Sequence, residues 1–400
     1  MNDLFAELGL RRVINGTGYA TVLGASPVSD EVIAAVAGIL TQNVEMIDLQ
    51  RAASEAIATA TGAEAGCVTA CAASGIAVGI AATITGDDLA HIEALPDGAG
   101  MKNEVVIQKA HCIDYSGNIT QMIRIAGAKP VEIGSVNGAG TYHLEGAIGP
   151  NTAAGLFVVS AQAPQGSFIG LTDFVRVCHA EGVPVIVDAA TDYDLRPFVE
   201  AGADLVIWSG HKRLGGLTAG VVAGKRDLVR AAYMQERGIG RAMKVGKEGV
   251  VGVIAALKRM GSEDQAARSA RETARIRMAV EKLSKLSGFS TEAAPDPTGK
   301  ALHRARIRID AAKAGISAHA ISQRLAAGDP TIKLDDYEAG LGILVIEPTC
   351  LSDKDMETIC ARIAEIVKAP GQGALEPPKD SLDDRRNRAL LAWPRRRAGR

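Results

Sequence analysis

A lysine and an aspartate each come directly after an apolar run that is typical of a buried strand. Asp188 follows VPVIV, and Lys212 follows DLVIWSGH. The interval between them fits one helix and one strand, so we expect the carboxyl ends of neighbouring parallel strands to bring both residues together. A third motif, CAASG at 71–75, separates an apolar run from a helix. Ser74 is predicted to cap this helix, with backbone N–H groups directed at an anion.

Pyridoxal 5′-phosphate is a ligand that needs all three features at once. Its aldehyde requires a lysine, its pyridine nitrogen requires a carboxylate, and its phosphate requires a helix start rich in N–H donors. Each feature alone has a simpler explanation, because Asp188 could cap a helix, Lys212 could be a solvated loop residue, and CAASG could be a packing turn. The order of the three and their positions after strands favour the cofactor.

Other ligand motifs are incomplete. GTGYAT at 16–21 ends in threonine where a dinucleotide-binding loop has glycine, and GVVAGKR at 220–226 has too short a spacer for a P-loop. The histidines are scattered, without the spacing of metal ligands. The sequence therefore predicts neither a P-loop nor a bound metal.

Seven apolar, β-branched runs alternate with helical stretches in the middle of the chain. Most are apolar at successive positions, which is typical of strands covered on both faces by helices. The sequence thus predicts an α/β fold with a mostly parallel seven-stranded sheet, with strands at 65–70, 104–109, 129–134, 155–161, 183–190, 204–210 and 219–224.

The helices outside this sheet set the predicted domain boundaries. Helices are expected at 29–40 and 48–62, capped by Ser29 and Asp48. A long charged helix at 262–288 leads to a small α+β layer. The predicted domains are an N-terminal arm with helices (1–62), a large cofactor-binding α/β domain (63–260), a linking helix with a small C-terminal α+β domain (261–370), and a mobile basic tail (371–400).

The composition narrows the class of protein. Lys and Arg number 44 against 46 Asp and Glu, so there is no global positive field for nucleic acid. Residues 65–86 carry no charge, but a strand followed by a short helix explains them better than a membrane span. The N-terminus lacks a secretory signal, and the six cysteines form no CxxC pair. We expect a cytoplasmic protein with reduced thiols.

Five segments resemble the fold-type I pyridoxal-phosphate enzymes, and among them the group that contains selenocysteine synthase and D-glucosaminate-6-phosphate ammonia-lyase. The segments are INGTGYATVLGASPVS, TACAASGIAVGIAA, VIQKAHCIDY, VPVIVDAATDYDL and DLVIWSGHKRLGGLTAGVVAG. The resemblance implies the fold-type I transferase fold and pyridoxal 5′-phosphate as cofactor. It implies a Schiff base at Lys212, a pyridine partner in Asp188, phosphate contacts from Ser74, Gly75 and Ser209, ring contacts from Ala190 below and His111 above, and a contact of Gln162 with the phenolic oxygen.

One segment departs from the pattern. Many fold-type I enzymes hold the substrate carboxylate with an arginine on a strand of the small domain, whereas GILVIEPT offers Glu347 and Pro348. Arg306 and Arg308 are possible substitutes, as are the N-terminal Asn15 and Thr17. Because the resemblance begins near residue 10, no separate N-terminal domain and no tRNA substrate are expected.

The resemblance implies a lyase that eliminates ammonia from a small β-hydroxy amino acid to give a 2-oxo acid. An aldolase, a racemase, and a selenium or sulfur transferase are alternatives, because substrate orientation selects the bond that breaks. A non-catalytic binding module is a further alternative, against which Lys212 and Asp188 argue. A pocket at strand ends needs a cover, so we expect a homodimer or higher homo-oligomer in which Thr218 reaches the partner's phosphate.

Overall fold

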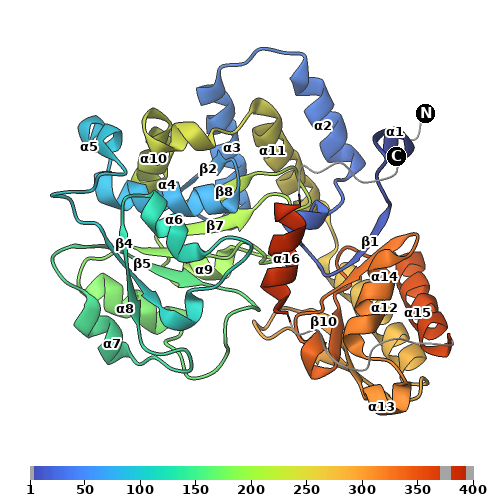
Figure 1. Cartoon of the computed structure of the whole chain (residues 1–400). Helices are drawn as coiled ribbons and strands as arrows, with labels where there is room; N and C mark the ends of the chain where they lie inside the picture. Colours follow the sequence, from blue (N-terminus) through green and yellow to red (C-terminus); the bar gives the residue numbers. More distant parts are fainter. Residues whose placement is uncertain (1–3, 370–379, 393–400) are drawn as a thin grey trace. The chain divides into compact units, whose positions relative to one another are not determined.

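The computed structural model describes residues 4–369 and 380–392. The chain forms two compact units, which we call the large unit (Ala25–Glu263) and the split unit (Met1–Gly24 together with Asp264–Arg400). Figure 1 labels their helices and strands.

A seven-stranded sheet forms the centre of the large unit. All seven predicted runs are strands of this sheet, and the strand order is β2-β8-β7-β6-β5-β3-β4. Only β8 runs antiparallel to its neighbours, β2 and β7. The predicted mostly parallel α/β sheet is confirmed. The strands are β2 Ala65–Thr69, β3 Glu104–Gln108, β4 Lys129–Ile133, β5 Thr152–Val158, β6 Val185–Asp188, β7 Leu205–Ser209 and β8 Gly220–Gly224.

Helices cover both faces of this sheet (Figure 1). Side chains alternate along each strand, so Ile186 and Ile207 pack with α4, α6 and α10, on what we call the α4 face. Val187 and Val206 pack on the opposite face with α2, α3, α8 and α11. The helices are α2 Asp30–Leu40, α3 Met46–Thr61, α4 Ala72–Thr85, α5 Leu89–Ala94, α6 Ile119–Ile125, α7 Thr141–Ala147, α8 Leu171–Ala180, α9 Arg196–Glu200, α10 Arg226–Met234 and α11 Lys247–Ser262, with 3-10 turns η2 Lys109–His111, η3 Gln235–Arg237 and η4 Ile239–Met243.

The helix starts test the predicted caps. Ser29 caps α2 as predicted, accepting a hydrogen bond from the Val32 N–H. The prediction for Asp48 was wrong, because α3 begins two residues earlier at Met46. Asp48 instead lies in the first turn and pairs with Arg51, where its negative charge is favourable at a helix N-terminus.

The split unit has its own apolar core, built from α12, α14 and α15 against the strands. A three-stranded antiparallel sheet has the order β12-β10-β9, and β1 pairs in parallel with β11. The elements are α1 Leu4–Leu8, β1 Val13–Gly16, η1 Thr21–Leu23, α12 Gln265–Leu283, β9 Phe289–Pro295, β10 His303–Ile309, α13 Ala311–Ala314, α14 Ala318–Ala327, β11 Thr331–Leu334, η5 Ala339–Leu341, β12 Ile343–Ile346, α15 Asp353–Lys368 and α16 Leu382–Leu391.

The two compact units divide the chain differently from the domains predicted from the sequence. Residues 1–24 join the C-terminal residues because β1 pairs with β11, and α2 and α3 pack on the large sheet. The predicted tail contains helix α16, whereas 370–379 and 393–400 lie outside the described residues. Residues 65–86 form β2 and α4, and no helix of the described ranges is long and apolar enough to cross a membrane.

Candidate active site

The predicted phosphate turn connects β2 to α4. Helix α4 begins at Ala72, and Cys71 is its N-cap, so the prediction of Ser74 as the cap was wrong. Cys71 has extended backbone geometry, and its Sγ accepts a hydrogen bond from the Ser74 N–H at 3.4 Å. Ser74 Oγ bonds to the Cys71 backbone, while the Gly75 N–H donates to the Cys71 carbonyl. Within the described residues, the first-turn N–H groups of Ala72 and Ala73 have no hydrogen-bond partner.

The strands beneath this turn bring small residues into one row. Thr69 and Ser209 both lie opposite Gly220 in the sheet register. A Cβ at Gly220 would lie less than 3.0 Å from the carbonyl group of Cys71 and from the Thr69 hydroxyl. The turn therefore rests directly on Gly220, and Thr69 Oγ donates to the Cys71 carbonyl at 2.9 Å.

Gly75 lets the helix approach the sheet. A Cβ there would lie 3.1 Å from Ile207 Cγ2 and 3.3 Å from Val222 Cγ2. The contacts of this predicted phosphate-binding residue are thus packing contacts, and its N–H is already used inside the helix. The N–H groups left for an anion belong to the turn before it.

Asp188 is the last residue of β6 and is buried. It follows Ile186 by two positions, so its side chain lies on the α4 face, as does that of Ser209, two positions after Ile207. Asp188 Oδ1 accepts a hydrogen bond from the Ala190 N–H at 3.1 Å, and the Ala190 carbonyl accepts one from the Ser209 N–H at 3.3 Å. The carboxylate is therefore held at a strand end on the same face as the phosphate turn.

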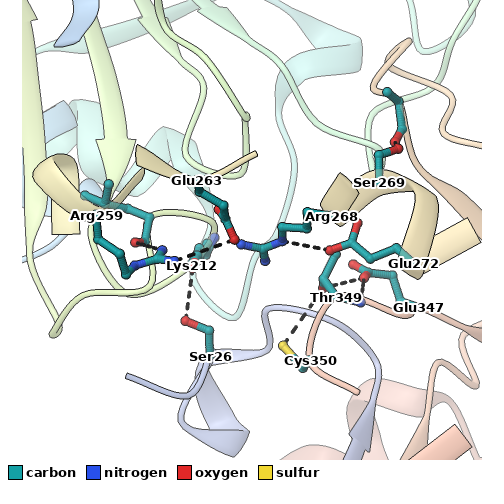
Figure 2. Close-up of polar contacts among 12 residues, drawn as sticks. Ser26, Lys212, Arg259, Glu263, Arg268, Ser269, Glu272, Glu347, Thr349 and Cys350 are labelled. Carbon is teal, nitrogen blue, oxygen red and sulfur yellow. Dashed lines mark hydrogen bonds and ion pairs between the residues drawn. The ribbon is translucent and has the colours of Figure 1, made fainter. Parts of the chain in front are cut away.

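Lys212 lies in the turn that follows β7, and its backbone is fixed by Ser26 (Figure 2). Ser26 Oγ donates to the carbonyls of His211 at 2.7 Å and Lys212 at 3.0 Å. The Gly215 N–H closes the turn by donating to the Lys212 carbonyl at 3.0 Å. The lysine therefore projects from a rigid backbone at the carboxyl end of the sheet, next to the strand that ends in Asp188.

His111 lies directly after β3 and is also buried. Its Nδ1 accepts a hydrogen bond from the Val158 N–H at 3.2 Å, so the proton of the neutral ring is on Nε2. Burial lowers the pKa of His111 to about 4. An edge-to-face contact with Phe157 fixes the plane of this neutral ring.

The other predicted site residues are less constrained or lie in the split unit. Gln162 and Thr218 are exposed at the surface of the large unit. In the split unit, Asn15 Oδ1 accepts from the N–H and hydroxyl of Thr17. The two arginines suggested for a carboxylate are Arg306, which pairs with Glu338 at 2.8 Å, and Arg308, which is exposed.

Glu347 lies in the segment GILVIEPT, where many fold-type I enzymes have the arginine that binds the substrate carboxylate. It is buried, and its Oε1 accepts hydrogen bonds from the N–H of Thr349 at 2.9 Å and from its hydroxyl at 2.5 Å (Figure 2). Burial raises the pKa of this carboxyl, against the lowering effect of Thr349 and Arg304. Its hydrogen bonds with Thr349 fit an anchored structural acid.

Sequence reasoning missed Thr69, Gly220 and Ser26. These residues interact with predicted site residues through sheet register or a long-range hydrogen bond, which a local pattern does not reveal. No group of three or more His, Cys, Asp or Glu suited to a metal ion lies within the described ranges.

Comparison with known proteins assigns the chain to a protein family. The family profile described as SelA, L-seryl-tRNA selenium transferase, matches residues 13–324. The chain belongs to the L-seryl-tRNA selenium transferase family. D-glucosaminate-6-phosphate ammonia lyase of Salmonella typhimurium is 37% identical over 92% of this chain and 98% of its own length. The 5′-C-glycyluridine monooxygenase-decarboxylase of a Streptomyces species is 37% identical over 91% of this chain and 92% of its own length.

Solved structures agree with the family assignment. A structure of D-glucosaminate-6-phosphate ammonia-lyase matches with a TM-score of 0.82 and 36% identity, covering 92% of this chain and 99% of the other. The protein is therefore an enzyme with the fold-type I fold, and its cofactor is pyridoxal 5′-phosphate.

The residues of the large unit fit this cofactor. The two available N–H groups of Ala72 and Ala73 lie above the row formed by Thr69, Gly220 and Ser209, where a Cβ on the glycine would block the turn. On the same face, Asp188 supplies a buried carboxylate. The donors suit a phosphate and the carboxylate suits a protonated pyridine nitrogen.

Proposed function

We propose that the protein is a lyase that eliminates ammonia from a small β-hydroxy amino acid and releases a 2-oxo acid. The substrate loses its α-proton and its β-hydroxyl, and hydrolysis of the resulting enamine gives ammonia and the 2-oxo acid. When bound, pyridoxal 5′-phosphate supplies an acceptor for the electron pair left at the α-carbon.

The residues of the large unit divide this work. Lys212 Nζ holds the cofactor, is displaced by the substrate amine, and then takes the α-proton as a general base. The Asp188 carboxylate keeps a proton on the pyridine nitrogen, and its burial strengthens that ion pair. Ser209 and the turn before Gly75 bind the phosphate, and Ala190 contacts the lower face of the ring.

His111 and Gln162 contribute to positioning in this proposal. His111 Nε2–H is the donor left on a neutral ring, so it is suited to bind a substrate or cofactor oxygen above the ring plane. Gln162 is assigned to the phenolic oxygen, and Asn15 and Thr17 to the substrate. A variant of Asn15 or Thr17 is expected to raise KM more than it lowers kcat.

The observation that carries the proposal is the match, along almost the whole of both chains, to the ammonia lyase of Salmonella typhimurium. A second candidate is a monooxygenase-decarboxylase, because the Streptomyces relative with that name is as identical in sequence to this chain as the ammonia lyase is. A monooxygenase-decarboxylase reaction would consume dioxygen and release carbon dioxide. The two candidates therefore differ in their products.

A screen of the purified holoenzyme separates these candidates. D- and L-β-hydroxy amino acids, each with and without a terminal phosphate, are tested for release of ammonia and a 2-oxo acid in equal amounts. Lys212→Ala protein is the control. Ammonia and 2-oxo acid from one substrate class, without dioxygen uptake, is the expected result. Dioxygen uptake with carbon dioxide release, or no ammonia from any substrate, would contradict the lyase assignment.

We further propose a cytoplasmic homodimer or higher homo-oligomer. Exposed apolar side chains on α2 and α3 support the oligomer, since Ile33, Leu40 and Ile47 are each at least half exposed in the single chain. Thr218, also exposed, is assigned to the partner's phosphate. Sedimentation alongside turnover tests the oligomer, and activity after subunit exchange between Lys212→Ala and Thr218→Ala proteins tests the shared site. A fully active monomer would refute both.

A further inference from the structure

The hydroxyl of Tyr115 is buried but makes no hydrogen bond within the described part of the chain. A buried hydroxyl normally has a partner, because losing its bonds to water is unfavourable. The ring itself is only half-buried. The Tyr115 hydroxyl is therefore the part of this side chain that lacks a hydrogen-bond partner, and a bound ligand could supply one.

The loop that carries Tyr115 is held in place by local hydrogen bonds. The Tyr115 N–H donates to the Gly117 carbonyl at 3.2 Å, and the Ile119 N–H donates to the Ile113 carbonyl at 3.1 Å. The Ser116 N–H donates to Asp114 Oδ1 at 2.8 Å. Because the loop is fixed at these points, the tyrosine ring has a defined position.

That position is on the α4 face of the sheet. Tyr115 packs against the same apolar core as Ala72, the first residue of α4. The side chains of Asp188 and Ser209 lie on this face as well, at the carboxyl ends of β6 and β7. The tyrosine, the phosphate turn and the carboxylate thus lie on one side of the sheet, within one compact unit.

The electrostatics of the hydroxyl agree with this position. The pKa of Tyr115 is raised, first by burial and then by the carboxylate of Asp188. A raised pKa keeps the hydroxyl protonated at neutral pH. Tyr115 is thus a hydrogen-bond donor on the face of the sheet that carries Asp188 and the start of α4.

We propose that Tyr115 is a cofactor-binding residue whose hydroxyl donates a hydrogen bond to the phosphate of pyridoxal 5′-phosphate. The phosphate is the best acceptor, because Asp188 is matched to the pyridine nitrogen, whereas Ala72, whose N–H is available for an anion, packs against the same apolar core as Tyr115. The phosphate then gives the buried hydroxyl the partner that the protein itself does not supply.

Cofactor affinity of the full-length protein, measured apart from turnover, tests this assignment. Cofactor-free wild type and Tyr115→Phe are titrated with pyridoxal 5′-phosphate and with pyridoxal, which lacks the phosphate. Loss of one hydrogen bond to a charged group is expected to weaken pyridoxal 5′-phosphate binding by about tenfold and to leave pyridoxal binding unchanged. Because no substrate is used, the result is independent of the reaction proposed above.

Two controls keep the outcomes distinct. Tyr337→Phe removes the hydroxyl of a tyrosine that is 78% exposed in the split unit, and it should leave both affinities unchanged. The cofactor-free Tyr115→Phe protein should melt no lower than wild type, because the hydroxyl that it lacks has no protein partner. Equal losses for both ligands, or no loss for either, would overturn the phosphate assignment. A lower melting temperature without cofactor would also overturn it, by revealing a protein partner.

Discussion

A methyl group added at Gly220 would disturb the phosphate turn without touching any proposed catalytic side chain. In Gly220→Ala, the new Cβ would lie less than 3.0 Å from the carbonyl group of Cys71 and from Thr69 Oγ1. One obstacle is backbone, and the hydroxyl is bonded to that same carbonyl, so neither can move freely. The turn itself must therefore shift away from β8.

The loss of folding stability in Gly220→Ala follows from other substitutions that add a methyl group to a packed interior. Overpacking a well-packed interior costs about 1–3 kcal/mol. A loss of about 2 kcal/mol would lower the melting temperature of a domain of this size by roughly 4–8 °C. Displacing the Ala72 and Ala73 N–H groups would weaken at least one charge-assisted hydrogen bond, and thus pyridoxal 5′-phosphate binding by about tenfold or more.

Thermal unfolding and cofactor titration measure the two effects. The matched control is Gly38→Ala in helix α2, where an added Cβ meets nothing within 4 Å. The control should be stabilised by up to about 1 kcal/mol, because alanine favours a helix over glycine, and its cofactor affinity should not change. A Gly220→Ala protein with wild-type melting temperature and wild-type cofactor affinity would refute the idea that the turn rests on β8.

Three further outcomes are expected. Borohydride reduction of the holoenzyme should fix the cofactor on Lys212, and Lys212→Ala should abolish both the label and turnover; a label on another lysine in peptide mapping would contradict this. Burial lowers the pKa of His111 from 6.5 to about 4, so between these pH values the unfolded chain binds a proton that the folded chain does not. The free energy of unfolding of wild type should therefore fall by up to about 3 kcal/mol as pH falls from 6.5 to 4. His111→Gln should lose less over that range in denaturant titrations, and equal losses would count against a buried neutral imidazole. Burial raises the pKa of Glu347, so the folded chain holds a proton that the unfolded chain has released, and the stability of wild type should fall as pH rises above 4.5. Glu347→Gln should therefore gain stability relative to wild type as pH rises from 4.5 towards neutral, and a constant difference over this range would contradict the raised pKa.

The strands of the large unit could be predicted because their side chains are apolar on both faces. Val185, Ile186 and Val187 are all fully buried, so no polar alternation obscures the pattern. Asp188 interrupts that pattern at the strand end, which is why the sequence predicts it as a site residue. The same reasoning predicted Lys212 as a site residue, because it follows the buried strand β7 within a short turn.

What the sequence could not predict depends on contacts between distant residues or on unusual chemistry. Cys71 caps α4 through its sulfur, a poor acceptor that propensity arguments pass over in favour of Ser74. The role of Gly220 depends on its register with Thr69, and that of Ser26 on a hydrogen bond to Lys212. The position of Tyr115 requires the packing of a loop on the sheet, which no local period encodes.

The pairing of Val13–Gly16 with Thr331–Leu334 has a consequence for how the chain is made. During synthesis the N-terminal strand leaves the ribosome long before its partner exists, while Ala25–Glu263 holds every strand of the large sheet. The large unit can therefore fold during translation, whereas the split unit can close only after residue 334 has emerged. Until then residues 13–16 have no strand to pair with, and unpaired strand segments are places where folding chains aggregate. Slow translation of the last third of the message would prolong that exposure without altering a single contact of the native protein.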